Sequence, residues 1–321
     1  MTRHTPRPRG GRPLAAAALA ALLLAAAPLA SAAAEPVFPP GSAIGLEPPP
    51  GYTTARAFTG FQSPDGGTVV LAQFPAAAWP EMADGMTPER LAQNGLEDST
   101  RRSLRVAGRE GVLIEGRQAA RGLTYTRWLA VFPGEGFTGL VTVNLPGHPP
   151  SEAGRARVEA ALAGLAVRAP DRAAQVAALP FAFRETEELR VQEVVMGSTV
   201  LLGEAAGRAR KPTLVIAAST GVPPGADRVE LAEGALRSLA QYTDLEVERS
   251  ERARVAGSEG VFTLARANDA NGRGPVRLAQ WIAFPPGGAG AAIRAIGEAV
   301  PEEFDAALPG FRRVVDSLAA R

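Results

Sequence analysis

The sequence predicts an α+β protein made of two tandem copies of one unit, each a mainly antiparallel sheet flanked by helices. Residues 105–112 read RVAGREGV, and residues 254–261 read RVAGSEGV, 149 positions later. A second pair follows, WLAVFPG at 128–134 and WIAFPPG at 281–287, now offset by 153 positions. Alternating apolar residues around both pairs are typical of half-buried strands. Similarity at this long spacing indicates that one folding unit occurs twice.

The first 34 residues predict a cleaved signal peptide. Four arginines precede an apolar run over residues 14–29, and small residues follow up to Ala34. This order of charged, apolar and small residues is typical of export signals. A membrane anchor is the alternative, but the run contains Pro28 and is short for a bilayer span of roughly 20 residues. We expect cleavage after Ala34, with Ala32 as the alternative.

Composition excludes several classes of protein. The chain has no cysteine, which rules out disulfides and a lipidated N-terminus, so the core alone must stabilise the exported protein. Without residues 1–34, 30 basic side chains face 33 acidic ones. This near neutrality argues against a nucleic-acid-binding surface.

The first copy is predicted over residues 37–167. Strands are expected around a turn at 63–67, and Thr87-Pro88 predicts a helix start, since proline is tolerated at the first helical position. An amphipathic helix with Val158, Leu162 and Leu165 closes the unit. The expected strands are 55–61, 68–74 and a meander from 103 to 145.

Residues 168–178 predict a connection, and the second copy follows over 179–321. Asp227 with Glu230 resembles a capping box that begins a helix reaching Tyr242. Asn271-Gly272 predicts a hairpin turn. The last helix is expected to kink or break at Pro309-Gly310. The expected strands are 191–195, 199–204, 213–218, 245–255, 260–267, 275–284 and 291–297.

This order of elements resembles the PsbP-like α/β/α fold, which a photosystem extrinsic subunit, a nuclear-import cofactor and periplasmic DcrB-type proteins share. The stretches IGLEPPPG at 44–51 and LPF at 179–181 also resemble a family of uncharacterised exported alphaproteobacterial proteins with two such units. The resemblance implies two α/β/α sandwiches that act mainly by binding proteins. Its motifs are structural, so it assigns no catalytic residue.

Two motifs resemble catalytic or nucleotide-binding sequences. Residues 134–139 match G-x-G-x-x-G, but the following residues continue as a strand rather than a helix, which favours a hairpin turn. Ser219, after an apolar strand, resembles a nucleophile elbow. The hydrolase order places the histidine after the serine, whereas His148 precedes it.

Other candidate sites also have simpler interpretations. One histidine after residue 34 and no cysteine make a zinc or transition-metal site improbable, and no calcium-loop motif occurs. Glu110 and Glu259 could suggest a pair of catalytic carboxylates, but they occupy matching positions of the two copies, so the repetition itself explains them. Trp128 and Trp281 are expected in the core rather than on a ligand platform. The sequence therefore predicts no catalytic, cofactor-binding or metal-binding residues.

We expect an exported, periplasmic or secreted, non-enzymatic protein that binds an unknown envelope protein or cell-wall component. Nucleic acid is not an expected partner, and no membrane span is expected after signal cleavage. Two alternatives remain: a periplasmic hydrolase that uses Ser219 or the acidic pair, and a carrier that holds a small ligand between the two repeats.

Expression in a Gram-negative host tests the export prediction. We expect the intact mass of the purified protein to correspond to a chain that begins at Ala33 or Glu35. Recovery of the chain with Met1 in the membrane fraction would contradict cleavage.

Overall fold

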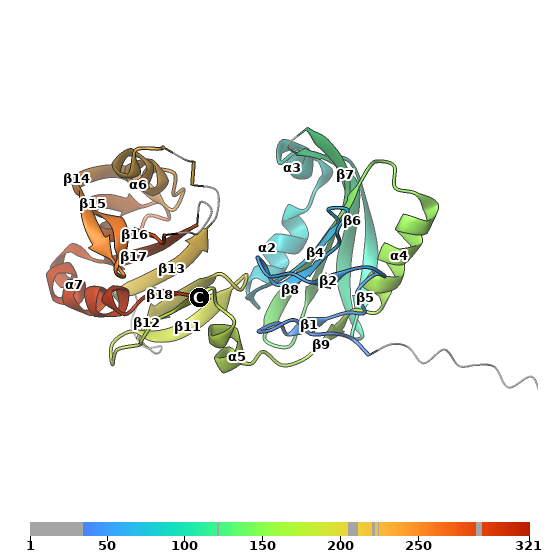
Figure 1. The fold of residues 1–321 in the computed structure, drawn as a ribbon, viewed down its shortest axis with the longest axis horizontal. Helices are drawn as coiled ribbons and strands as arrows, with labels where there is room; N and C mark the ends of the chain where they lie inside the picture. The colour runs from blue at the N-terminus through green and yellow to red at the C-terminus, as the bar shows by residue number, and fades with distance from the viewer. Residues whose placement is uncertain (1–34, 121, 205–210, 220–221, 224, 287–290) are drawn as a thin grey trace, which may run out of the picture. The chain divides into compact units, whose positions relative to one another are not determined.

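The computed structural model describes residues 35–321 except 121, 205–210, 220–221, 224 and 287–290. These residues contain two seven-stranded antiparallel sheets, each with helices packed against it (Figure 1). The predicted α+β class with two tandem units is therefore confirmed. The predicted signal peptide lies outside the described residues.

The first sheet has the strand order β2-β3-β4-β8-β7-β6-β5. A short lead-in strand, β1 (Ile44–Gly45), pairs with β9 (Ala166–Val167), so the start and the end of this repeat are hydrogen-bonded to each other. The strands of the sheet are β2 (Thr53–Thr54), β3 (Gly60–Gln62), β4 (Thr68–Pro75), β5 (Leu96–Val106), β6 (Arg109–Ala120), β7 (Leu123–Pro133) and β8 (Phe137–Pro146).

Both faces of the first sheet are covered. Helix α4 (Glu152–Ala163) and the lead-in pack on the face that carries Trp128 and Phe132. Helices α2 (Ala78–Gly85) and α3 (Pro88–Gln93) lie on the opposite face, over Ile114 and its neighbours. Ser151 and Thr87 cap α4 and α3 through their side-chain oxygens, as sequence-based capping predicts for Thr87.

The second sheet repeats this plan with the order β11-β12-β13-β17-β16-β15-β14. Its lead-in strand, β10 (Phe181–Ala182), pairs with the last strand, β18 (Ala319–Ala320). The strands of the sheet are β11 (Arg190–Val195), β12 (Thr199–Gly203), β13 (Thr213–Ser219), β14 (Tyr242–Val255), β15 (Ser258–Asp269), β16 (Gly274–Phe284) and β17 (Ala292–Ala299).

Helices again cover both faces of the second sheet (Figure 1). Helix α7 (Pro301–Asp316) buries Phe304, Phe311 and Val315 against one face. Helix α6 (Arg228–Arg237) buries Ala232 and Leu236 against the other. A short helix, α5 (Arg172–Ala177), lies within the predicted connection. Each repeat is thus a three-layer α/β/α arrangement.

Some element boundaries differ from the prediction in the first repeat. Within the predicted strand 55–61, residues 56–59 form a bend, and only Gly60 and Phe61 belong to β3. The helix predicted through Leu96 ends at Gln93, because Asn94 caps it and Gly95 (φ 79°) turns the chain. Leu96 begins β5 instead, and α2 was not predicted.

In the second repeat, the helix predicted to reach Tyr242 is shorter than expected, and the last helix is not divided in two. Helix α6 ends at Arg237, and Tyr242 begins β14 instead of extending the helix. Helix α7 runs without a break through Pro309 and Gly310. Proline removes one intrahelical hydrogen bond, and the burial of the apolar side on the sheet offsets that loss.

The two recurring tryptophans lie on corresponding strands but not at corresponding positions. Trp128 on β7 pairs with Glu115, whereas Trp281 on β16 pairs with Phe262, the counterpart of Leu113. Relative to the strand opposite, the two tryptophans therefore differ by two residues. Alternate strand residues share a face, so both rings still enter the core beneath the closing helix, with exposures of 0% and 6%.

The shift changes the partners of the two rings. Trp128 donates through Nε1 to Oε2 of Glu115 at 3.1 Å, and Arg155 on α4 holds both oxygens of this carboxylate at 2.5 Å. Trp281 instead packs against Phe262, with ring centroids 5.2 Å apart. One repeat thus ties its closing helix to the sheet with a charged network, and the other packs this region with aromatic rings.

Substitution of the tryptophans tests both the burial and the difference in partners. We expect Trp128→Ala and Trp281→Ala each to lower the free energy of unfolding by about 3–5 kcal/mol. Trp128→Phe should cost about 1 kcal/mol more than Trp281→Phe, because only Trp128 loses a hydrogen bond. Urea denaturation curves measure these values. A change within about 0.5 kcal/mol for either alanine variant would indicate a surface ring.

A polar network anchors α6 to the second sheet. Gln280 donates to the carbonyl of Ala232 at 2.9 Å, and Arg294 donates to Gln280 Oε1 at 2.7 Å and to the carbonyl of Ala235 at 3.1 Å. Burial lowers the pKa of Arg294 to about 10. Tyr242 donates to Glu298 at 2.6 Å, and burial followed by this carboxylate raises the pKa of Tyr242 well above its usual value.

The raised pKa of Tyr242 predicts a loss of stability in alkali. An unfolded tyrosine ionises near pH 10, whereas the folded one stays neutral. The contribution of neutral Tyr242 to the free energy of unfolding is therefore complete below pH 10 and falls as pH rises further. Between pH 9 and 11, the free energy of unfolding of Tyr242→Phe should fall less steeply than that of the wild type, by up to about 1.4 kcal/mol per pH unit. Arg294 is common to both proteins, so equal slopes would contradict the assignment.

Candidate functional site

A pocket of about 420 Å³ opens in the second repeat beside the first half of α7. Its walls come from three segments: the residues before β11, the residues that follow β12 and precede β13, and α7. It is lined by Glu188, Leu189, Glu204, Lys211, Pro212, Glu302, Glu303, Ala306, Ala307, Gly310, Phe311 and Arg313. We call it the α7 pocket.

The sequence of α7 explains why this space is open. Pro301 starts the helix, and Glu302 and Glu303 occupy its first turn, where carboxylates interact favourably with the helix dipole. Small residues follow at Ala306, Ala307 and Gly310, so α7 itself projects no long side chain from these three positions. A Cβ atom at Gly310 would meet only side-chain atoms of Arg313 and Leu189, at 3.8 and 3.9 Å.

The floor of the α7 pocket is apolar and its rim is charged. Leu189 and Phe311 belong to the hydrophobic core and supply the floor. Four carboxylates and two cationic side chains line the pocket. Such a combination of an apolar surface with a few polar groups is typical of binding sites.

Two of the four carboxylates are already neutralised within the chain. Arg313 lies 3.4 Å from Glu188, and Lys211 forms an ion pair with Glu204. The pKa of Glu188 is lowered, first by its own backbone N–H, then by the Thr186 hydroxyl and by Arg313. Among the described residues, Glu302 and Glu303 have no ion-pair partner. Among the described lining residues, the two carboxylates without an ion-pair partner therefore lie at the start of α7.

The first repeat has a pocket of about 250 Å³ at the corresponding place. The paired strands β1–β9 and β10–β18 align the two repeats at both ends. In this alignment Gly154 and Val158 of α4 correspond to Ala307 and Phe311, and Tyr52, just before β2, corresponds to Leu189 just before β11. These residues line their respective pockets. The position of the pocket thus belongs to the repeated fold.

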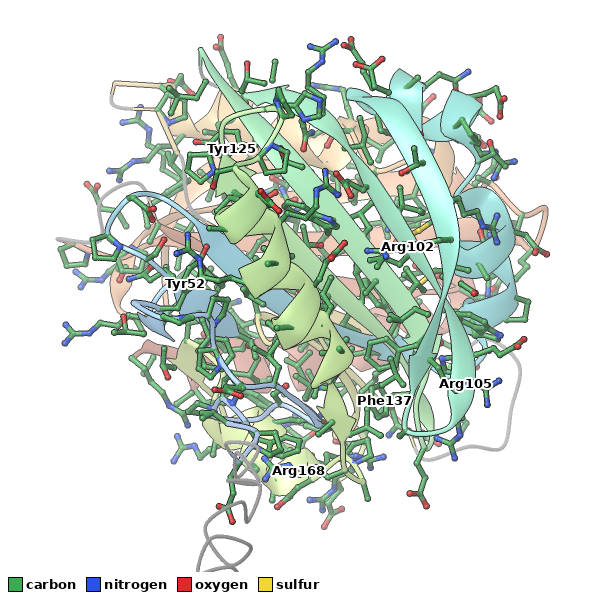
Figure 2. The ribbon with its side chains drawn as sticks, turned by 90° about the vertical axis from the view of Figure 1, so that its right-hand side faces the viewer. Tyr52, Arg102, Arg105, Tyr125, Phe137 and Arg168 are labelled. Atoms are coloured by element: carbon green, nitrogen blue, oxygen red, sulfur yellow. The ribbon has the colours of Figure 1, made fainter. Side chains whose placement is uncertain are left out.

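Side-chain differences make the first pocket smaller and balance its charge. Arg157 of α4 takes the place of Gly310, and Asp65 lies opposite in the turn between β3 and β4. Tyr52 lies beside α4 (Figure 2) and adds a ring where the second repeat has Leu189. Burial raises the pKa of the Tyr52 hydroxyl. Among the described residues, the pocket of the second repeat is therefore larger and has more acidic than basic side chains.

The structure does not bring together the residues of the hydrolase alternative. Ser219 is exposed at the end of β13, in the second repeat. His148 follows β8 in the first repeat, where its Nδ1 lies 3.1 Å from the Thr126 hydroxyl. No hydrogen bond joins Ser219 to a histidine or carboxylate in the described part of the chain.

The Gly-rich motif lies at a hairpin, and the two recurring glutamates lie near the starts of strands. Residues 134–136 form the turn between β7 and β8, as the hairpin interpretation predicts, and Phe137 begins the next strand. Glu110 and Glu259 are exposed second residues of β6 and β15, in different sheets. Glu110 lies 3.9 Å from Arg105, and Glu259 forms an ion pair with Arg228.

The described residues contain no group of three or more histidine, aspartate or glutamate side chains that could hold a metal ion. No helix in the same residues is long and apolar enough to cross a membrane.

Comparison with solved structures finds likenesses at low identity. LpqN, described as involved in cell envelope biogenesis of Mycobacterium tuberculosis, is 15% identical, with 43% of this chain and 82% of that one covered and a TM-score of 0.34. Cyanobacterial PsbP from Synechocystis sp. PCC 6803 is 11% identical, with coverage of 44% and 82% and a TM-score of 0.29. The type VI secretion immunity protein TplEi from Pseudomonas aeruginosa is 13% identical, with coverage of 84% and 96% and a TM-score of 0.32.

No protein-family profile matches the chain. No curated protein matches it either. The resemblance to exported alphaproteobacterial proteins stays an expectation. The three TM-scores are all below 0.5.

Proposed function

We propose that the protein is an exported, non-enzymatic binding protein and that the α7 pocket receives part of a partner protein. The observation that carries this proposal is the difference between the two equivalent pockets. The first repeat lines its smaller pocket with Arg157 and Tyr52, whereas the second has Gly310 and Leu189 at these positions. Its pocket also has two carboxylates, Glu302 and Glu303, for which the described residues supply no ion-pair partner.

The chemistry of the lining supports binding rather than catalysis. The pocket presents carboxylates, two cations and apolar groups, and none of its lining residues is serine, threonine or histidine. Glu302 and Glu303 are consecutive on a helix, so their side chains diverge by about 100° and do not converge on one reacting atom. A nucleophile requires a base within about 2.6–3.2 Å. The hydrolase alternative therefore rests on Ser219 alone.

A small-ligand carrier is the second candidate. The volume of 420 Å³ is within the range of about 300–1,000 Å³ that small-molecule sites occupy. We place partner docking first because the pocket is open to solvent on its charged side, where Glu302 and Glu303 are exposed.

A pair of glycine substitutions tests the proposal. Gly310→Arg gives α7 the residue that α4 has at this position and fills the pocket. Gly234→Arg makes the same change on the exposed side of α6, where a Cβ would meet nothing within 4 Å. Arginine has a higher helix propensity than glycine, which favours folding of the variant at the exposed Gly234. Gly310 is buried beside Arg313 and Leu189, so a thermal unfolding curve must show that Gly310→Arg is folded.

We expect the tagged wild-type protein and Gly234→Arg to retain the same partner from envelope extract. Gly310→Arg should lose that partner while its thermal unfolding stays cooperative. Equal retention by both variants would exclude the α7 pocket as the docking site. Turnover of ester or peptide substrates that Ser219→Ala abolishes, without a retained partner, would favour the hydrolase.

A further inference from the structure

We propose that strand β5, at the edge of the first sheet, receives an extended acidic segment of a partner protein as an additional strand. This site lies in the first repeat and does not depend on the α7 pocket. Three observations carry the proposal: the free backbone edge of β5, the arginines along it that lack partners, and the different charges of the equivalent edge in the second repeat.

The outer side of β5 is an open sheet edge. β5 is the last strand in the order of its sheet, and its pairing with β6 is continuous from Thr100 to Val106. Within the described part of the chain, no backbone hydrogen bond joins this stretch to a segment other than β6. Figure 2 shows Arg102 and Arg105 along this outer strand. An extended peptide can therefore pair with the edge through main-chain hydrogen bonds.

Arginines dominate the charge of this stretch. Arg102 forms an ion pair with Glu159 at 3.0 Å, and Arg105 lies 3.9 Å from Glu110. The side chains of Arg105 and Glu110 are 72% and 83% exposed, so this contact contributes little. Arg101 has no carboxylate within 4.0 Å, although every aspartate and glutamate of the chain is among the described residues. The open edge therefore keeps positive charge that the chain does not neutralise.

Two of these arginines share one face of the strand. Arg101 is paired with Ile114, which packs beneath α2 and α3. Alternate strand residues share a face, so Ser103 and Arg105 lie on this side too, whereas Arg102 lies on the side of α4 with its partner Glu159. An added strand with two acidic side chains four residues apart would place them opposite Arg101 and Arg105. Opposite charges directly across two strands are stabilising.

The same arginines disfavour pairing with a second copy of β5. Directly opposite residues share a face, so an antiparallel pair of β5 strands centred on Arg101, Arg102 or Ser103 always places one arginine opposite another. Like charges in this arrangement are destabilising, and charged edges protect sheets from self-association in this way. The edge therefore selects an acidic strand as its occupant.

The equivalent edge of the second repeat balances its own charges. β14 occupies the corresponding end of its sheet, and acidic and basic side chains are intermixed along it. Its ion pairs are Glu246 with Arg266, Glu248 with Arg277, Arg249 with Glu251 and Arg252 with Asp227. Because both edges have the same place in the fold, the surplus of arginine is particular to the first repeat.

Fluorescence anisotropy with labelled peptides tests the proposal. The probe is Ser-Glu-Val-Thr-Val-Glu-Ser with blocked ends, and its control has glutamine in place of both glutamates. We expect the glutamate peptide to bind about fivefold more tightly at low salt, because two opposite-charge pairs form across the strands. This preference should shrink as salt screens the exposed charges. A third peptide, N-methylated at its third and fourth residues, lacks donors on both edges and should bind roughly tenfold more weakly than its parent.

Protein variants locate the binding site. Arg101→Gln with Arg105→Gln should abolish the preference for glutamate over glutamine. Arg249→Gln with Arg254→Gln makes the same change in net charge on β14 and should leave the preference unchanged. All four side chains are exposed, so both proteins should remain folded. The glutamate peptide should slow amide hydrogen exchange in residues 100–106 but not in β14.

The outcomes also separate this proposal from docking at the α7 pocket. Equal binding of the glutamate and glutamine peptides, or a preference that persists in Arg101→Gln/Arg105→Gln, would overturn the acidic assignment. If the N-methylated peptide binds as tightly as its parent, charge alone holds it and the added strand is wrong, as for an anionic lipid or polysaccharide. Gly310→Arg should bind the glutamate peptide as the wild type does, because its substitution lies in the other repeat.

Discussion

Each central strand in this protein must fill two hydrophobic cores at once, and this requirement determines much of the structure. In β7, Trp128, Ala130 and Phe132 enter the core beneath α4, while Leu129 packs beneath α2 and α3. A shift of one residue in the strand register would move each set of side chains to the opposite face of the sheet. The helices on both faces therefore fix the register of the sheet as firmly as its hydrogen bonds do.

Because alternate residues of a strand share a face, the same requirement permits a core side chain to differ by two positions along the strand. The tryptophans of the two repeats differ by two positions along the hairpin, yet each enters the core of its own repeat beneath the closing helix. What changed is its neighbour, a carboxylate held by Arg155 in one repeat and a phenylalanine in the other. Sequence similarity alone suggests that the two rings coincide, because a motif carries no information about the strand opposite it.

Local signals in the sequence identified most strands and the starts of α3 and α6, because turns and caps depend on a few adjacent residues. The ends of these helices were less predictable. Leu96 and Tyr242 continue the apolar spacing of a helix, but both are the first residues of long edge strands. The α7 pocket was not predictable, because it joins Leu189, Glu204 and Gly310 from three separate segments. The small residues Ala306 and Gly310 were a possible signal, although small residues also occur in helices without a pocket.

The short strand pairs β1–β9 and β10–β18 have a consequence for how such a protein can arise and be engineered. Each pair brings the first and last segments of a repeat together, so each repeat begins and ends at one place on its own surface. A chain with adjacent ends can be copied in tandem through a short connection without opening either core. It can also be circularly permuted, because a short loop can join its old ends while new ends are cut in an exposed turn. A permuted single repeat would keep its pocket while moving its chain ends away from it.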